Sequence, residues 1–177
     1  MEEFEDPTEK LNDKINEEAG EAKQREKDKW IMGVALFTAI ISVFAAFSGM
    51  LSGHHENESL IAQMKSSDQW AYYQAKGIKK EIISSYVKMQ GNTDTAALSK
   101  VKQYGVDQEQ IKTKAEDYEK EMEEHLARHS KIARAVTLFQ ITIAISAISI
   151  LTRKKIFWFL GMLFAVAGCA FLALGLM

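Results

Sequence analysis

Four histidines are the side chains of this sequence best suited to bind a metal ion or a proton. His54 and His55 follow a first strongly apolar segment, whereas His125 and His129 precede a second one. The spacing of four places His125 and His129 on one face of a helix, as in helical zinc-binding pairs. The four residues are therefore a candidate site for a divalent metal or for proton sensing. Alternatively, His125 and His129 fill an interhelical contact at the level of the lipid headgroups, and His54 and His55 are polar residues at a helix end.

The rest of the sequence shows no pattern typical of catalysis. It has no HExxH motif, no glycine-rich phosphate loop, no dinucleotide fingerprint, and no serine, cysteine or carboxylate constellation with a reaction pattern. We therefore expect no enzymatic activity and no cofactor apart from the metal considered above. The net charge of −2 and the lack of a basic cluster argue against nucleic acid as a partner.

Three apolar segments must position the histidines. Each contains about 20 residues, enough for a helix to cross the roughly 30 Å hydrocarbon core of a bilayer. We predict an all-α fold with three transmembrane helices and an extramembrane, coiled-coil-like helical hairpin. The predicted segments are an acidic tail (1–29), transmembrane helix 1 (30–52), the hairpin (53–131), transmembrane helix 2 (132–151), a turn (152–155) and transmembrane helix 3 (156–177).

Basic residues near the apolar segments predict the orientation. The stretch KQREKDK, residues 23–29, precedes the first segment, and TRKK, residues 152–155, joins the second to the third. Lysine and arginine concentrate on the cytoplasmic side of membrane proteins. We therefore expect a multi-pass protein of a bacterial inner membrane with a cytoplasmic N-terminus and a periplasmic hairpin. Arg128, Lys131 and Arg134 at the other end of the second segment argue against this orientation.

Small and apolar residues at spacings of three and four predict the core of the hairpin. On its returning limb and into the second apolar segment these are Ile111, Ala115, Tyr118, Met122, His125, His129, Ile132 and Val136. On its outgoing limb they are Leu60, Met64, Ser67, Ala71, Ala75, Ile78, Ile82, Ser85 and Met89. The stretch GNTD, residues 91–94, predicts a turn between the limbs followed by a helix start, and Gly105 predicts a break in the returning limb.

A second face of the outgoing limb carries Trp70, Tyr73 and Gly77, within the stretch SDQWAYYQAKG. Two limbs alone would leave this face in water, and an exposed aromatic patch usually marks an interface. We therefore predict that these three residues contact a neighbouring subunit in a homo-oligomer.

Small residues also recur within the apolar segments, where they let helix backbones approach closely. The positions predicted to pack transmembrane helices are Ala35, Ala39, Ser42, Ala46, Gly49 and Gly53 in the first segment and Gly161, Ala165 and Gly168 in the third. The second segment instead carries mild polar residues, which either form interhelical hydrogen bonds or line a pore. They are Thr137, Gln140, Thr142, Ser146 and Ser149.

The acidic tail contains a helix-start signal in DPTE, where Asp6 is a candidate N-cap, Pro7 the first helical residue and Glu9 the partner in a capping box. The tail is either a solvated segment or a docking helix for an unknown cytoplasmic protein.

The stretches LSGHHENES and SDQWAYYQAKGIK resemble the signature of a family of small bacterial inner-membrane proteins known only as a domain of unknown function. The resemblance extends from about residue 30 to the end and implies the three-span architecture, but no reaction. We expect a self-associating, membrane-anchored scaffold. The alternatives are a homo-oligomeric channel lined by transmembrane helix 2 and a periplasmic module that senses metal or pH.

Overall fold

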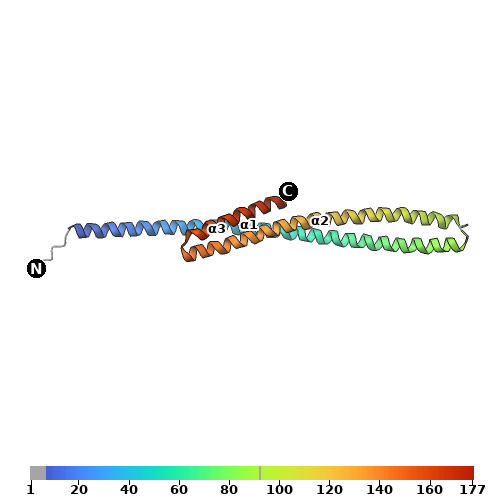
Figure 1. Ribbon diagram of the computed structural model, residues 1–177, viewed down its shortest axis with the longest axis horizontal. Coiled ribbons are helices and arrows are strands. Elements are labelled where there is room, and N and C mark those ends of the chain that lie inside the picture. The colour runs from blue at the N-terminus through green and yellow to red at the C-terminus, as the bar shows by residue number, and fades with distance from the viewer. Residues whose placement is uncertain (1–6, 92) are drawn as a thin grey trace. The chain divides into compact units, whose positions relative to one another are not determined.

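The computed structural model describes the backbone of residues 7–91 and 93–177 and the side chains of residues 14–91 and 93–177. Three helices account for almost all of these residues: α1 (Pro7–Met89), α2 (Thr95–Thr152) and α3 (Lys155–Leu176) (Figure 1). Each contains a segment long and apolar enough to cross a membrane, and no strand occurs in the described ranges. The predicted all-α fold with three such helices is confirmed, as expected for a multi-pass membrane protein.

Helix α1 joins the predicted tail helix, the first apolar segment and the outgoing limb into one element of 83 residues. It begins at Pro7, the only proline of the chain, which suits the first helical position because that residue needs no N–H donor. The predicted N-cap, Asp6, lies outside the described residues, as does the side chain of Glu9.

A tight turn joins α1 to α2. Gly91 adopts a φ of +66°, a left-handed conformation that glycine tolerates best, and its N–H donates to the carbonyl of Lys88. Asp94 then caps α2 because its Oδ1 accepts the N–H groups of Ala96 and Ala97, at 3.1 and 3.0 Å. Gly91 therefore follows the end of α1 and Asp94 caps the start of α2, as the predicted turn requires.

The prediction of a break at Gly105 is wrong, since α2 runs through it. A Cβ at this position would lie 3.5 Å from Nζ of Lys80 on α1. Glycine costs a helix only about 1 kcal/mol relative to alanine, which the packing of the neighbouring helix outweighs.

The chain divides into two compact units. The first contains residues 1–47 and 135–170, and its helices pack around Phe139. The ring centroids of Phe139 and Phe44 lie 6.2 Å apart, and Gly168 of α3 presses against the same Phe139 ring. A hydrogen bond also joins α2 to α3, since Thr142 Oγ1 donates to the carbonyl of Gly161 at 3.3 Å.

The second unit contains residues 48–134 and 171–177 and includes the hairpin, in which α1 and α2 run side by side in opposite directions (Figure 1). The core predicted for its returning limb is confirmed. Ile111, Ala115 and Ile132 are buried, and Tyr118, Met122, His125 and His129 are partly buried.

The core predicted for the outgoing limb is wrong. All nine predicted residues are exposed, among them Met64 at 68%, Ile78 at 62% and Ile82 at 64%. One set of positions that faces α2 instead repeats every seven residues and is buried or partly buried. They are Ser52, Ser59, Ser66, Tyr73, Lys80 and Val87.

Serines occupy this core because small residues on α1 accommodate large residues on α2, and because their hydroxyl groups reach α2. Ser59 Oγ donates to the carbonyl of Met122 at 3.2 Å, and Ser66 Oγ lies 3.5 Å from Oε1 of Glu119. Hydrogen bonding offsets the cost of burying a hydroxyl group, so a buried serine is not a defect here.

Candidate functional site

Two of the four histidines meet at the base of the hairpin, near the predicted membrane surface. The Nδ1 atoms of His55 on α1 and His125 on α2 lie 3.0 Å apart. The ring of His54 lies beside that of His55, tilted by 50°, with ring centroids 5.6 Å apart. A hydrogen bond between two Nδ1 atoms requires one ring to donate and the other to accept. The pair therefore holds one proton between two nitrogens, and a second proton there would break the bond.

His129 has a different partner. Its Nδ1 lies 3.0 Å from the carbonyl oxygen of Ser52 and 3.1 Å from the Ser52 hydroxyl group. Because a carbonyl oxygen only accepts, Nδ1 of His129 carries the proton and donates it. Across the described residues, no three His, Cys, Asp or Glu side chains converge in an arrangement that could hold a metal ion. The geometry thus joins His55 to His125 and turns His129 toward the α1 backbone.

The surroundings of His55 disfavour its charged form. Burial is the largest cause that lowers its pKa below the ordinary 6.5, followed by charge repulsion from His125, His54, Arg128 and His129. Protonation of His55 therefore opposes the native contact between the two limbs. Acid would therefore place a charge where the hairpin disfavours it.

Trp70, Tyr73 and Gly77, which we predicted to form a subunit interface, lie along the contact between α1 and α2 of one chain. Trp70 Nε1 donates to Oε1 of Glu119 at 2.7 Å, and its ring meets Tyr73 edge-on at 5.6 Å. A Cβ on Gly77 would lie 2.8 Å from Nε2 of Gln108. Contact with a neighbouring subunit stays a prediction, and it would have to use the parts of these side chains that α2 leaves uncovered.

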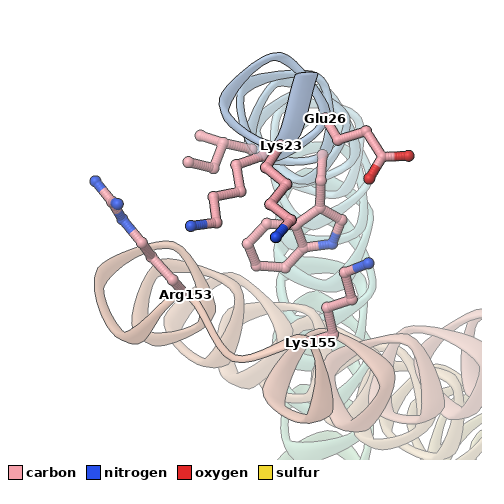
Figure 2. Close-up of a pocket in the computed structure, with 7 residues that line it drawn as sticks. Lys23, Glu26, Arg153 and Lys155 are labelled. Carbon is pink, nitrogen blue, oxygen red and sulfur yellow. The ribbon is translucent and has the colours of Figure 1, made fainter. Parts of the chain in front are cut away.

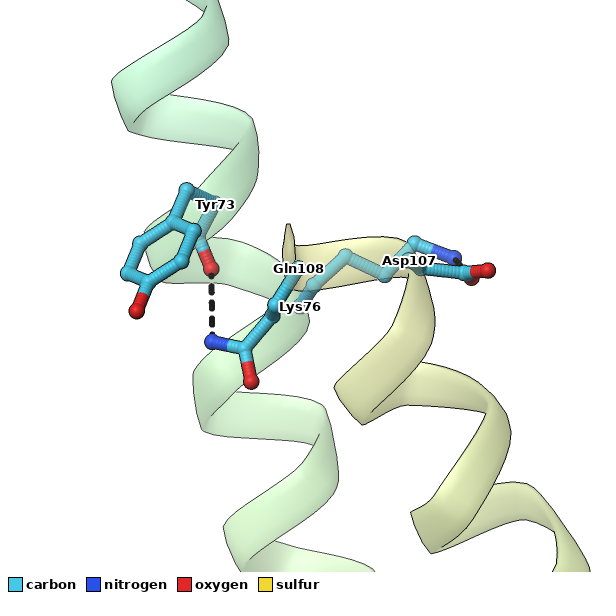
Figure 3. Close-up of polar contacts among 4 residues, drawn as sticks. All are labelled: Tyr73, Lys76, Asp107 and Gln108. Atoms are coloured by element: carbon cyan, nitrogen blue, oxygen red, sulfur yellow. Dashed lines mark hydrogen bonds and ion pairs between the residues drawn. The ribbon is translucent and has the colours of Figure 1, made fainter. Parts of the chain in front are cut away.

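Gln108 and its neighbour Asp107 tie this region of the hairpin together (Figure 3). Gln108 Nε2 donates to the backbone carbonyl of Tyr73 at 3.4 Å, and Lys76 pairs with Asp107 at 2.7 Å. The hydrogen bond to Asp107 is the largest cause that raises the pKa of Lys76. Lys76 also lies 4.9 Å from the ring centroid of Tyr104, a distance typical of a cation–π contact.

One exposed face of α1 carries the nine residues that we predicted to form the core of the outgoing limb. We call it the apolar stripe, made of Leu60, Met64, Ser67, Ala71, Ala75, Ile78, Ile82, Ser85 and Met89. Its spacings of four and three are those of a coiled-coil seam, yet no helix in the described part of the chain covers it. Near the turn, part of it lines an open groove with Glu81 and Tyr86.

The small residues of the first apolar segment also face away from the other helices of the chain. Ala35, Ala39, Ser42 and Ala46 are exposed, and a Cβ on Gly49 or Gly53 would meet no atom within 4 Å. The opposite arrangement holds in α3, where three small residues pack against α2 or are buried: Gly161, Ala165 and Gly168.

The polar residues of the second apolar segment lie mainly inside the chain. Thr142, Ser146 and Ser149 are fully buried, and Ser149 Oγ donates to the carbonyl of Lys154 at 3.0 Å. Gln140 is exposed. Thr142 Oγ1 donates to the carbonyl of Gly161 on α3, whereas Ser146 Oγ is buried without a hydrogen-bond partner. The burial of three of these polar side chains inside the chain argues against a pore lining at their positions, and the interhelical hydrogen bond is made by Thr142.

Comparison with known proteins gives one match. The family model described as "Domain of unknown function (DUF4337)" matches residues 30–177. No curated protein and no solved structure matches the chain. The match covers the three apolar segments and the hairpin, and it leaves out the acidic tail.

Proposed function

The chain belongs to the DUF4337 family, and we propose that it is a multi-pass protein of a bacterial inner membrane that self-associates through its hairpin and serves as a scaffold. The observation that carries this proposal is the apolar stripe. Soluble surfaces rarely leave a long, regular row of Ile, Leu and Met in water, and such patches usually mark interaction sites.

A second copy of this chain suits the stripe because copies in one membrane share their orientation. Two α1 helices would then run parallel, and the spacings of four and three would let equivalent side chains meet along a coiled coil. In sequence, the small residues of the first apolar segment continue the same register, since Gly53 and Leu60 are seven residues apart. The same helix could thus associate within the membrane and outside it.

A comparison of the free energy of side-chain burial with the cost of association indicates that most of the stripe must take part. Burying one Ile, Leu or Met side chain contributes about 1.5–3 kcal/mol. Association costs roughly 4–15 kcal/mol in lost freedom, so one or two such side chains are not enough. Leu60, Met64, Ile78, Ile82 and Met89, each at least half exposed, together reach the scale that a stable dimer requires.

Two lysine substitutions on the stripe test the proposal. Ile78→Lys with Ile82→Lys should convert the protein in mild detergent to monomers, as measured by native mass spectrometry, while helix content is retained. The matched control, Gln63→Lys with Gln90→Lys, adds the same charge at exposed positions off the stripe and should keep the oligomer. A monomeric wild-type protein, or an oligomer that survives the Ile78 and Ile82 changes, would contradict self-association through the stripe.

A disulfide test examines the parallel arrangement directly. In a Cys169→Ala background, Ile78→Cys should cross-link to its own copy in membranes, because equivalent residues meet in a parallel coiled coil. Lys79→Cys is the matched control, since it is exposed but lies about 100° away around the helix. Equal cross-linking at the two positions would indicate random collision instead of a defined interface.

The paired histidines support a second candidate function, a hairpin that responds to pH. The observation that favours it is the 3.0 Å contact between His55 and His125 at the hairpin base. On the proposed topology this pair faces the periplasm, a compartment that follows the external pH. A hairpin whose base opens in acid would change how the apolar stripes of two copies meet.

A further inference from the structure

A basic pocket of about 260 Å³ lies in the first compact unit, between α1 and the turn that joins α2 to α3. Figure 2 shows Arg153 and Lys155 on the turn side and Lys23 and Glu26 on α1. We define the basic pocket by the residues that carry its chemistry: Lys23, Glu26, Lys27, Trp30, Arg153 and Lys155.

The charge of this pocket is unbalanced. Its four basic side chains face a single carboxylate, that of Glu26, which gives a net charge of +3. Within the described part of the chain, none of the four cations forms an ion pair with a carboxylate. Like charges held close together repel one another, so the protein alone gains nothing from this arrangement. An anion in the pocket would relieve the repulsion.

An indole N–H adds a hydrogen-bond donor to the pocket. Trp30 lines it, and Nε1 of Trp30 is buried without a hydrogen-bond partner. A buried tryptophan N–H usually finds an acceptor, and an unsatisfied donor costs stability. Phosphate oxygens are strong acceptors, and arginine and lysine are their usual partners in proteins. The unpaired donor and the uncompensated cations therefore point to the same class of ligand.

The turn holds Arg153 in an unusual conformation. Its φ is +53°, in the left-handed region that residues other than glycine and asparagine seldom adopt. The turn is fixed by a hydrogen bond from Ser149 to the carbonyl of Lys154, and α3 starts directly after it at Lys155. Backbone strain of this kind often occurs at ligand sites. At position 153 glycine would fit the backbone better, yet the residue is an arginine whose side chain lines the pocket.

The place of the pocket residues along the chain indicates which kind of molecule carries the phosphate group. Trp30 opens the first apolar segment, and Lys155 directly precedes the third, so the pocket lies where both segments meet the membrane surface. Tryptophan prefers this level, and basic pockets between membrane helices bind anionic headgroups. We propose that the basic pocket binds the phosphate group of an anionic phospholipid. This proposal does not depend on self-association of the hairpin.

Lipid titration of the full-length protein tests the proposal. Native mass spectrometry in neutral detergent should show phosphatidylglycerol binding more tightly than phosphatidylcholine, whose headgroup is zwitterionic. Each basic residue near an anionic lipid contributes about five-fold in affinity, so Arg153→Asn with Lys155→Gln should weaken phosphatidylglycerol binding by about 25-fold. Asparagine suits the left-handed turn, so the fold should be retained.

The turn and the first helix also provide matched controls. Lys154→Gln with Lys29→Gln removes the same two charges from exposed residues that do not line the pocket, and affinity should change less than two-fold. Lys23→Gln with Lys27→Gln removes two charges that α1 contributes to the pocket and leaves the turn unchanged. It should reproduce the loss even if the turn variant fails to fold.

Three results would overturn the proposal. The first is equal loss in the pocket variants and in the Lys154 and Lys29 control, which would indicate a diffuse surface charge. The second is equal binding of phosphatidylcholine and phosphatidylglycerol. The third is competition by millimolar inorganic phosphate that displaces the lipid fully, which would identify a site for the free anion.

Discussion

A methyl group added at Gly168 tests the closest helix contact of the chain. An alanine Cβ there would lie 2.7 Å from Cε1 and 2.9 Å from Cδ1 of Phe139, so the ring must move by about 0.7 Å to reach the 3.4 Å of ordinary contact. Phe139 is fully buried and also packs against Phe44, which leaves it little room. Overpacking of this kind costs about 1–3 kcal/mol.

The matched control is Gly33→Ala, in the first apolar segment, where an added Cβ meets no atom within 4 Å. Both substitutions gain the same helix propensity, about 1 kcal/mol. We therefore expect Gly168→Ala to be less stable than Gly33→Ala by about 1–3 kcal/mol, which is a difference in melting temperature of roughly 2–12 °C for a chain of this length. Thermal unfolding followed by circular dichroism in detergent measures it.

A smaller side chain at position 139 should remove the conflict. Phe139→Leu alone is expected to destabilise the protein, but combined with Gly168→Ala it should cost at least about 0.5 kcal/mol less than the two single changes together. Equal stability of the Gly168 and Gly33 variants, with no coupling to Phe139, would show that α3 does not pack on α2 as described.

Three further predictions concern the hairpin and its placement. Because the pKa of His55 is lowered, its contribution to stability is complete above pH 6.5 and is lost as the pH falls through that lowered pKa. Protection from hydrogen exchange near His125, corrected for the intrinsic pH dependence of exchange, should therefore fall between pH 7.5 and pH 5, and His55→Gln should flatten this response. Trp70→Phe removes the donor to Glu119 and should cost about 1–3 kcal/mol in thermal unfolding, and a much smaller loss in a Glu119→Leu background, which lacks the acceptor, would identify this hydrogen bond as the cause. A topology reporter inserted within residues 90–95 should score as periplasmic, whereas the reverse result would place the paired histidines in the cytoplasm.

The sequence predicts those features that depend on local hydrophobicity. Three apolar segments were enough to predict three helices that can cross a membrane, and the turn chemistry of Gly91 and Asp94 located the end of the hairpin. The returning limb was predicted because Ile111, Ala115 and Ile132 are apolar or small and also buried. In these cases the pattern and the environment agree.

The outgoing limb was missed because its pattern and its environment disagree. A search for apolar residues at helical spacing finds Ile78 and Ile82, which are exposed, and passes over the serines of the core. One signal was present: Ser52, Ser59 and Ser66 repeat at an interval of seven. All three of these serines are buried in the hairpin core.

The candidate sites needed distances that no local pattern contains. The sequence placed all four histidines near one level, but only the structure separates the pair at 3.0 Å from His129, which turns to Ser52. The basic residues of the tail and of the turn served to predict orientation. Their convergence around Trp30 depends on how α1 packs beside the turn before α3, which the sequence does not specify.

The distribution of polar and apolar residues in the hairpin carries a consequence for its stability. The side of α1 that contacts α2 is rich in Ser, His, Lys and Tyr, whereas the outer face of α1 is rich in Ile, Leu and Met. Two helices bury little apolar area, and ordering each residue costs roughly 1–2 kcal/mol in backbone entropy alone. Hydrogen bonds such as that from Trp70 to Glu119 fix the register of the limbs, but each contributes only about 1–3 kcal/mol. Much of the apolar area that could stabilise this hairpin therefore lies on its outside, and it stabilises the hairpin only when another surface covers it.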